Sequence, residues 1–113
     1  MNNIPLSTVP YQSFSIRLEQ DLYDIIISET DGLMSISIMR NSTPIVLGQR
    51  IEPSYPLIPY LYLFEGKGNF IMLTEDNMYP YYTQFGVNQF LLYVTSLEMQ
   101  TALASIQNGS SRP

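Results

Sequence analysis

Histidine, cysteine and tryptophan are absent from the 113 residues, and only 13% of the chain is charged. The absence of histidine removes the commonest general base and the commonest metal ligand in proteins. The absence of cysteine rules out disulfides and thiolate metal sites. Nucleophilic catalysis by a serine or cysteine with a histidine base is therefore excluded, and we expect neither a cofactor nor a metal site.

Basic residues are also scarce, because five lysines and arginines stand against ten acidic residues and give a net charge of −5. A protein that binds nucleic acid needs a basic stripe to neutralise phosphates. The basic residues here form no run along the chain: Arg17, Arg40, Arg50, Lys67 and Arg112. Specific nucleic-acid binding is therefore not expected.

Long hydrophobic segments are missing as well. The longest nearly uncharged stretch, residues 53–64, is too short and too rich in proline to cross a bilayer. The N-terminus lacks the basic segment followed by an apolar one that a signal peptide requires. We therefore expect synthesis in the cytoplasm and no membrane anchor.

Apolar residues are abundant: 45% of the chain is hydrophobic, with nine tyrosines and six methionines. A chain of this length forms a single domain, residues 1–113, around one core. The low charge suits either a compact β protein with neutral polar residues outside or a subunit that buries part of its surface in an assembly. Abundant tyrosine and methionine with a single lysine favour the assembly subunit.

Short apolar segments separated by turn signals run through residues 13–95. Residues 14–18 and 34–38 alternate apolar and polar side chains, which is typical of a half-exposed strand. Residues 22–28 contain three consecutive isoleucines, which suits a strand buried on both faces. Gly48 interrupts an apolar segment and predicts either a β-bulge or a close approach of another backbone segment. We expect strands over 14–18, 22–28, 34–38, 45–51, 70–74 and 89–95, and hence an all-β fold, either a small antiparallel β-barrel or a sandwich.

The two ends of the chain differ from the core. Pro5 and Pro10 lack the backbone donor that a central strand needs, so the N-terminal segment is expected to be a proline-rich arm docked along a sheet edge, either of its own barrel or of a neighbouring subunit. Near the other end, good helix formers follow Ser96, which we expect to cap a short helix. The expected boundaries are 1–12 for the extended arm, 13–95 for the β core, 96–107 for the short helix and 108–113 for a disordered tail.

Nine positions near the N-terminus fit the pattern I-P-L-S-x-V-P-x-Q-x-F-S: Ile4, Pro5, Leu6, Ser7, Val9, Pro10, Gln12, Phe14 and Ser15. The pattern resembles the opening of the small baseplate plug proteins of contractile-tailed phages. A weaker likeness extends over roughly residues 4–95, through the segments 43–51, 56–60, 66–70 and 89–94.

This resemblance implies a structural protein of the virion that is not an enzyme. Such a protein sits at the centre of the tail baseplate, among the hub, the tail tube and the end of the tape-measure protein. There it helps to close the lumen until ejection. The symmetry of a tail axis implies a threefold or sixfold homo-oligomer. The chain would be made in the host cytoplasm before assembly.

Two segments carry the side chains that we expect to contact partners. The arm is apolar, and the loop over residues 75–88 has more aromatic rings than a mobile loop needs. Tyrosine combines a large apolar area with a polar tip, which suits contacts between proteins, although the rings would equally close the ends of a small barrel. The predicted contact residues are Ile4, Pro5, Leu6, Val9 and Tyr11 in the arm, with Leu6 and Val9 seated in pockets, and Tyr79, Tyr81, Tyr82 and Phe85 in the loop. A second aromatic group, in the proline-containing connector over residues 53–64, comprises Tyr55, Tyr60, Tyr62 and Phe64.

The residues alone leave two other functions open. A small carbohydrate-binding β-sandwich would use the loop tyrosines as a stacking platform for a sugar ring. A glycosidase would need two carboxylates on either side of the bond. The residues for these alternatives are Tyr79, Tyr81 and Tyr82 for the platform, and Glu75 with Asp76, or Asp21 with Asp24, for the carboxylates.

Two ligand motifs are incomplete. The oxygen-bearing residues 75–77 lack the D-x-D-x-D-G spacing of an EF-hand loop, so calcium binding is disfavoured. The segment 66–68 lacks the remaining residues of a phosphate-binding P-loop, and a hairpin turn explains it better.

Overall fold

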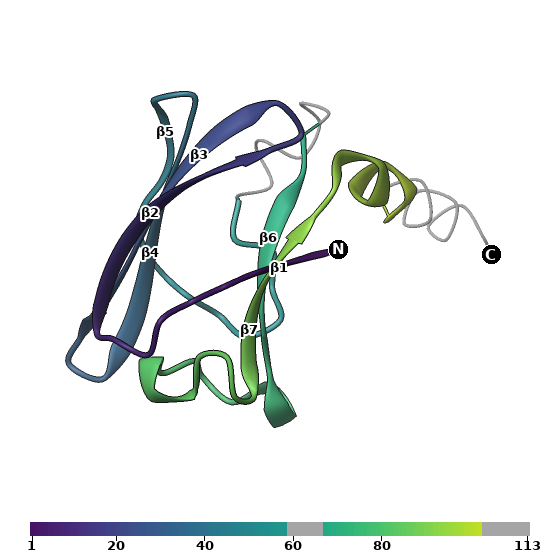
Figure 1. Ribbon diagram of the computed structural model, residues 1–113. Helices are drawn as coiled ribbons and strands as arrows, with labels where there is room; N and C mark the ends of the chain where they lie inside the picture. Colours follow the sequence, from purple (N-terminus) through teal and green to yellow (C-terminus); the bar gives the residue numbers. More distant parts are fainter. Residues whose placement is uncertain (59–66, 103–113) are drawn as a thin grey trace.

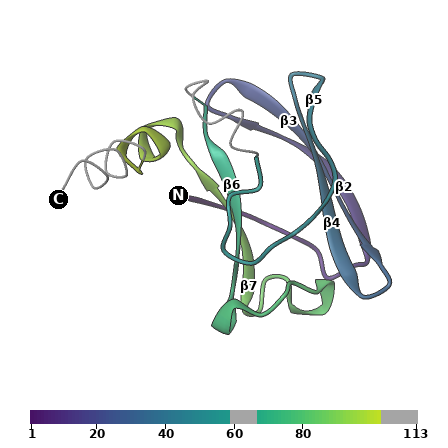
Figure 2. The same ribbon diagram turned by 180° about the vertical axis from the view of Figure 1, so that it is seen from behind.

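The computed structural model describes residues 1–58 and 67–102, which form two antiparallel β-sheets packed face to face (Figures 1 and 2). One sheet has the order β2 (Tyr11–Leu18), β3 (Asp21–Thr30), β4 (Leu33–Arg40), β5 (Thr43–Arg50). The other has the order β1 (Asn2–Ile4), β7 (Gln89–Val94), β6 (Asn69–Thr74). Among the described residues the sheets do not close on each other, so the all-β prediction is confirmed in its sandwich form.

Tight two-residue turns connect the strands of the four-stranded sheet. In each turn both residues have positive φ: Glu19 and Gln20, Asp31 and Gly32, Asn41 and Ser42. Paired positive φ angles are those of hairpin turns whose twist matches that of the flanking strands. The Asp31–Gly32 turn has the Asp-Gly sequence typical of such hairpins, and between β4 and β5 the strands extend inward until only Asn41 and Ser42 remain in the turn.

Strand β3 corrects the expectation that residues 22–28 are buried on both faces. Tyr23, Ile25 and Ile27 are buried, whereas the alternate side chains, including that of Ile26, are only partly buried. An antiparallel sheet in a two-layer sandwich has one covered face and one wet face, so alternate residues must face outward whatever their type. The run of three isoleucines therefore does not mean that all three side chains are buried.

Gly48 marks a β-bulge, one of the two features that the sequence predicted at this position. Ile36 pairs with Gln49 but Ile38 pairs with Val46, so two residues of β5 lie opposite the single residue Ser37. Gly48 adopts a φ of 58°, and its backbone N–H donates to the Ser37 hydroxyl at 2.8 Å. The extra residue bends the edge strand and is stabilised by a side chain of its neighbour.

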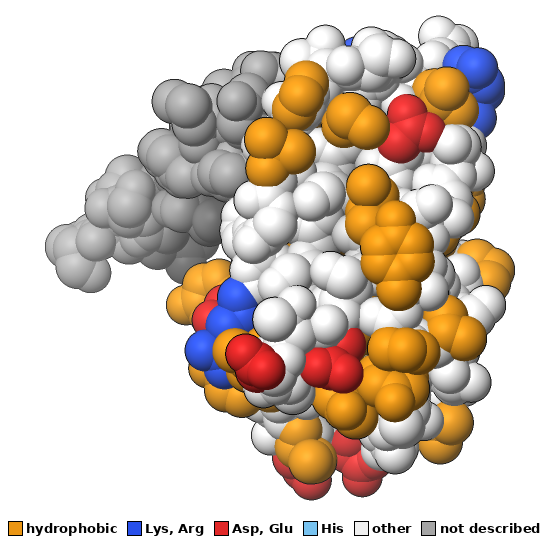
Figure 3. All heavy atoms as spheres, turned by 90° about the vertical axis from the view of Figure 1, so that its left-hand side faces the viewer, with side chains coloured by type: hydrophobic (Ala, Val, Ile, Leu, Met, Phe, Trp, Pro, Cys, Tyr) orange, Lys and Arg blue, Asp and Glu red, His pale blue; other side chains and the backbone are white. Residues whose placement is uncertain are grey.

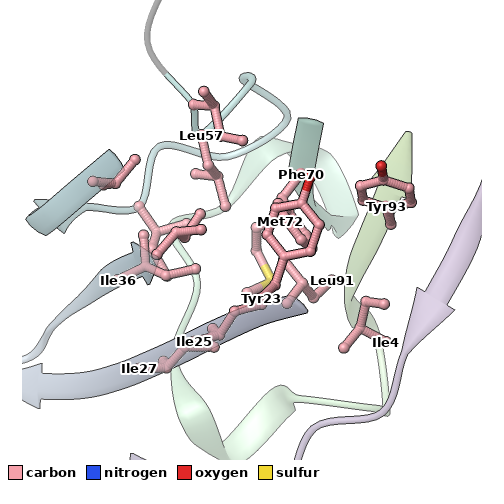
Figure 4. Close-up of a cluster of buried hydrophobic side chains, with 14 of the residues drawn as sticks. Ile4, Tyr23, Ile25, Ile27, Ile36, Leu57, Phe70, Met72, Leu91 and Tyr93 are labelled. Atoms are coloured by element: carbon pink, nitrogen blue, oxygen red, sulfur yellow. The ribbon is translucent and has the colours of Figure 1, made fainter. Parts of the chain in front are cut away.

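The core lies between the sheets and centres on three aromatic rings (Figure 4). Tyr23 of the four-stranded sheet meets Phe70 edge to face, with ring centroids 5.2 Å apart, and meets Tyr93 at 5.9 Å. Phe70 and Tyr93, on neighbouring strands of the other sheet, are 5.2 Å apart. All three side chains are essentially inaccessible to solvent, so this cluster ties one sheet to the other.

The arm and the C-terminal segment both attach to the three-stranded sheet. The arm begins as strand β1, which pairs with β7 and places Ile4 opposite Leu91. After β7 the chain enters a helix over residues 96–102. Its cap is Thr95, not Ser96 as predicted, because the Glu98 N–H donates to the Thr95 hydroxyl and the Thr95 N–H donates to the Glu98 carboxylate.

The Glu19 carboxylate links the β2–β3 turn to the end of β7. It accepts hydrogen bonds from the Tyr93 hydroxyl at 2.6 Å, the Ser96 N–H at 2.8 Å and the Ser96 hydroxyl at 2.9 Å. The hydrogen bond from Tyr93 lowers the pKa of Glu19 below its ordinary value of 4.5. Partial burial opposes this shift, and the hydrogen bonds from Ser96 add to it. Burial and the same hydrogen bond raise the pKa of Tyr93.

Acid should weaken this link between the sheets. A carboxyl whose pKa is lowered by folding stabilises the protein above its unfolded pKa, and this stabilisation is lost as the pH falls through the folded value. The free energy of unfolding, measured with urea, should therefore fall between about pH 5 and pH 3. Glu19→Gln should lower it by about 1–2 kcal/mol at pH 7 and flatten the acid dependence. Glu52→Gln, at an exposed position just before the connector, is the control, and an equal flattening in that variant would contradict the assignment.

Candidate partner-binding surface

One end of the sandwich, lowest in Figure 1, gathers segments from both sheets. The start of β2, the β3–β4 turn and the end of β5 meet there, because Tyr11 pairs with Ser28 and Arg50 pairs with Ser35. The long connection from β6 to β7 lies at the same end. We define this surface, the arm–loop end, by residues 5–11, 31–33, 50–55 and 75–88.

Hydrogen bonds hold the arm and the loop in place. The side-chain amide of Gln12 accepts from the Ser7 N–H at 3.0 Å and donates to the Ser7 carbonyl at 2.8 Å. The Pro10 carbonyl accepts from the Glu29 N–H at 2.8 Å. In the loop, the Tyr81 N–H donates to the Gln89 side chain at 2.9 Å. These contacts hold the arm where it crosses from β1 of one sheet to β2 of the other, and they hold the loop against β7.

The loop is shaped by two single turns of 3-10 helix, η2 (Glu75–Asn77) and η3 (Tyr82–Gln84). Within η2, Asp76 has a φ of 54°, a conformation that aspartate tolerates better than most residues. The loop returns through a hydrogen bond from the Gly86 N–H to the Gln89 carbonyl at 2.8 Å. The 14 residues expected to form one long loop are thus locally ordered.

The predicted contact residues fall into three groups. Val9, Tyr11 and Tyr79 have 39%, 61% and 52% of their surface exposed, and Pro5 is exposed as well. Partly buried and packed against the core are Leu6, Tyr81 and Tyr82. Ile4 and Phe85 are only 2% exposed, so both side chains belong to the core rather than to the surface. Within this chain Leu6 is partly buried, whereas Val9 is left exposed.

Other exposed apolar residues lie at this end that the sequence did not indicate as contact residues. Topology brings Leu33, Met78 and Val87 there, with 42%, 61% and 68% of their surface exposed. Nothing in their local sequence separates them from core residues, because only the strand order places them together. Tyr55 of the connector, 69% exposed, also lies at this end. Tyr60, Tyr62 and Phe64 lie outside the described residues.

Arg50 and Tyr79 form the best-defined contact between the sheets on this surface. The Arg50 guanidinium carbon lies 4.3 Å from the centre of the Tyr79 ring, a cation–π arrangement. Beside it is an open hollow of about 320 Å³, lined by residues 52–55 with Asn77 and Tyr79. Two of the lining residues are joined, because the Ser54 hydroxyl donates a hydrogen bond to the Asn77 side-chain carbonyl at 3.1 Å. The lining combines the rings of Tyr55 and Tyr79 with the polar side chains of Glu52, Ser54 and Asn77.

The arm–loop end is acidic as well as apolar. Four exposed carboxylates lie there: Asp31, Glu52, Glu75 and Asp76. Arg50 is the single basic side chain of the described part of this end. Arg17, Arg40 and Lys67 lie near the opposite end, next to the turns that β2 and β4 enter and the start of β6. Glu19 and Asp21 lie at that opposite end too and offset these basic residues, whereas at the arm–loop end the carboxylates outnumber Arg50.

The carboxylate pair Asp21 and Asp24 does not form a site. The two residues are three apart in β3 and so face opposite sides of the sheet. Asp21 is buried and binds the Asn41 amide at 2.9 Å and the Lys67 amine at 3.1 Å; burial opposes ionisation, but these donors lower its pKa. Asp24 accepts a hydrogen bond from the Ser15 hydroxyl on the outer face.

Metal and sugar sites find little support in the geometry. Residues 1–58 and 67–102 contain no cluster of three or more acidic, histidine or cysteine side chains placed to hold a metal ion. Glu75 accepts a hydrogen bond from the Asn88 amide at 3.1 Å. The rings of Tyr81 and Tyr82 are 4.7 Å apart and tilted by 41°, and they pack on each other and on the core instead of presenting a flat platform.

The fold and this surface define a small β-sandwich whose distinctive chemistry is an apolar, acidic end made by the arm and a long loop. The chain matches the family described as cyanophage baseplate Pam3 plug gp18 over residues 1–97. It belongs to this family of structural phage proteins and is a component of the virion, located in the tail baseplate. A search of curated proteins gave no match. None of the described helices is long and apolar enough to span a membrane.

Proposed function

We propose that this protein is a non-enzymatic plug on the tail axis that contacts the hub, the tail tube and the tape-measure protein and helps to close the lumen before ejection. In the virion it forms a threefold or sixfold ring, as the rotational symmetry of a tail favours. The arm–loop end is the principal contact surface. Its partner presents apolar side chains surrounded by lysine or arginine.

The extent of the family match carries this proposal. The matched residues 1–97 include every strand of both sheets and the whole arm–loop end, so the likeness covers the complete sandwich rather than a shared motif. The surface supports it further. Most of the large hydrophobic side chains with high exposure gather at this end: Val9, Tyr11, Leu33, Tyr55, Met78, Tyr79 and Val87. Exposed apolar side chains gathered in this way mark interaction sites.

Tail incorporation tests the assignment of the contact surface. In a phage lacking this gene and complemented from a plasmid, Val9→Ser combined with Tyr79→Ser should reduce the copies of this protein per purified virion at least about tenfold. The expectation rests on the loss of two partly exposed anchors, each worth about 1 kcal/mol or more at an interface. Quantitative mass spectrometry of virions, normalised to the tail-tube protein, measures the loss.

The matched control is Leu97→Ser, because Leu97 is 69% exposed but lies at the start of the helix, away from the arm–loop end. This variant should be incorporated like the unmodified protein. Thermal unfolding of all variants establishes that each is folded. Normal incorporation of the double variant, or equal losses in the double variant and the control, would show that the arm–loop end is not the contact surface.

A further inference from the structure

The outer edge of β2 is exposed in a way that the other sheet edges are not. β2 is eight residues long, contains no proline, and pairs only with β3 among the described residues. An unprotected edge of this length is a template for pairing with another chain. Figure 3 shows the side of the molecule that carries this sheet, where much of the surface is neutral and hydrophobic side chains are scattered between polar ones.

The remaining edges each carry a device that blocks pairing. Strand β1 has three residues and is followed by Pro5. Strand β5 contains Pro44 and two register shifts. The edge of β6 is covered by the connector, because the Ser54 and Leu57 N–H groups donate to carbonyls of that strand at 2.8 Å. Three of the four sheet edges in the described part of the chain are therefore blocked, and the β2 edge is the one that stays open to pairing with another chain.

The register identifies the backbone groups at this edge. Leu18 and Asp21 flank a two-residue turn and therefore form a hydrogen-bonded pair, and every second pair from there points its N–H and C=O groups into the hairpin. The hydrogen bond from the Glu29 N–H to the Pro10 carbonyl follows the same alternation. The residues whose N–H and C=O groups point outward are consequently Tyr11, Ser13, Ser15 and Arg17.

We propose that two copies of this protein pair through this edge, β2 against β2 in antiparallel orientation about a twofold axis, to form one continuous eight-stranded sheet in the free protein. In the register that gives backbone hydrogen bonds to all four outward residues, Ser13 lies opposite Ser15 of the second copy. It places Phe14 opposite its own counterpart on the axis. The same register sets Tyr11 opposite Arg17.

Side chains on both faces of β2 complement each other in this register. On the inner face, Phe14 and Ile16 are only half-buried in one copy, and pairing extends the apolar layer over them. On the outer face, the only charged side chain of the strand, Arg17, faces an exposed tyrosine ring instead of another charge. No like charges oppose each other, so a second copy fits this edge without the repulsion that normally protects edges.

Sedimentation velocity of the purified full-length protein tests the pairing. We expect a monomer–dimer equilibrium with a dissociation constant of about 1 mM or less. Ser13→Pro removes an outward N–H and leaves the β2–β3 ladder intact, and should raise the dimer dissociation constant at least about 100-fold. Ser13→Ala keeps the N–H and should dimerise like the unmodified protein. Far-UV circular dichroism confirms that both variants fold.

A charge swap tests the register and does not depend on proline being tolerated. Tyr11→Arg places like charges opposite each other at two positions of the dimer and should weaken dimerisation about tenfold. Adding Arg17→Glu restores opposite charges and should restore dimerisation. A monomer at 1 mM, or a Ser13→Pro variant that still dimerises, overturns the proposal. Failure of the charge swap to rescue overturns the register. None of these results depends on the baseplate role.

Discussion

Replacing Gly68 with alanine is expected to lower the free energy of unfolding by at least about 3 kcal/mol, the upper end of the penalty for overpacking. A Cβ at this position would overlap the ring end of Tyr93 and the Val94 carbonyl. Neither neighbour can yield easily, since Val94 belongs to the β7 backbone and Tyr93 is held by the aromatic cluster and by Glu19. The variant should therefore lose the link between the sheets as well.

Differential scanning calorimetry measures this effect, and a fall in the melting temperature of at least about 10 °C is expected, at roughly 4 °C per kcal/mol. Gly32→Ala is the matched control. Gly32 has a φ of 80° and open space around its Cβ position, so alanine there meets conformational strain but no overlap and should cost only about 1–2 kcal/mol. Equal melting temperatures for the two variants would contradict the close approach at Gly68.

Ile4→Asp is expected to abolish cooperative unfolding at 37 °C or to cost at least about 4 kcal/mol. Ile4 is 2% exposed and joins the core from strand β1, so an aspartate there would bury an unpaired charge. Urea titration followed by near-UV circular dichroism reads the tyrosine packing directly. The arm thus has a folding role at Ile4 in addition to the contact role proposed for its exposed residues.

Val9→Asp separates the two roles of the arm. Val9 is 39% exposed, so aspartate there should change the free energy of unfolding by less than about 1 kcal/mol while introducing a charge into the proposed contact surface. Near-equal stabilities of the Ile4 and Val9 variants would mean that the arm is not anchored in the core.

Much of the fold follows from local patterns in the sequence. The alternation over residues 34–38 and the Asp31–Gly32 turn predict β4 and the hairpin before it, because side-chain direction in a strand has a period of two. The bulge at Gly48 is likewise local. Pattern fails at Ile26, where an isoleucine faces outward, because burial is decided by what lies above the sheet rather than by the residue itself.

The candidate surface could be predicted only in part. Proline spacing and tyrosine content indicate the arm and the loop, but Ile4 is buried because β1 pairs with β7, and Phe85 is buried because its side chain packs into the core. Contacts such as Glu19 to Tyr93, which join residues 74 positions apart, leave no trace in a local pattern. Leu33 and Met78 join the surface only because the packing of the two sheets places the start of β4 and the end of β6 at the same end of the sandwich.

A cryo-electron microscopy map of the intact tail tip tests the central claim most directly. We predict density for this β-sandwich on the tail axis, repeated with threefold or sixfold symmetry, with Tyr79 and Val9 buried against the hub, the tube or the tape-measure protein and the lumen closed at that level. A baseplate map in which the sandwich lies at the periphery, or in which the arm–loop end faces open solvent, would contradict the account.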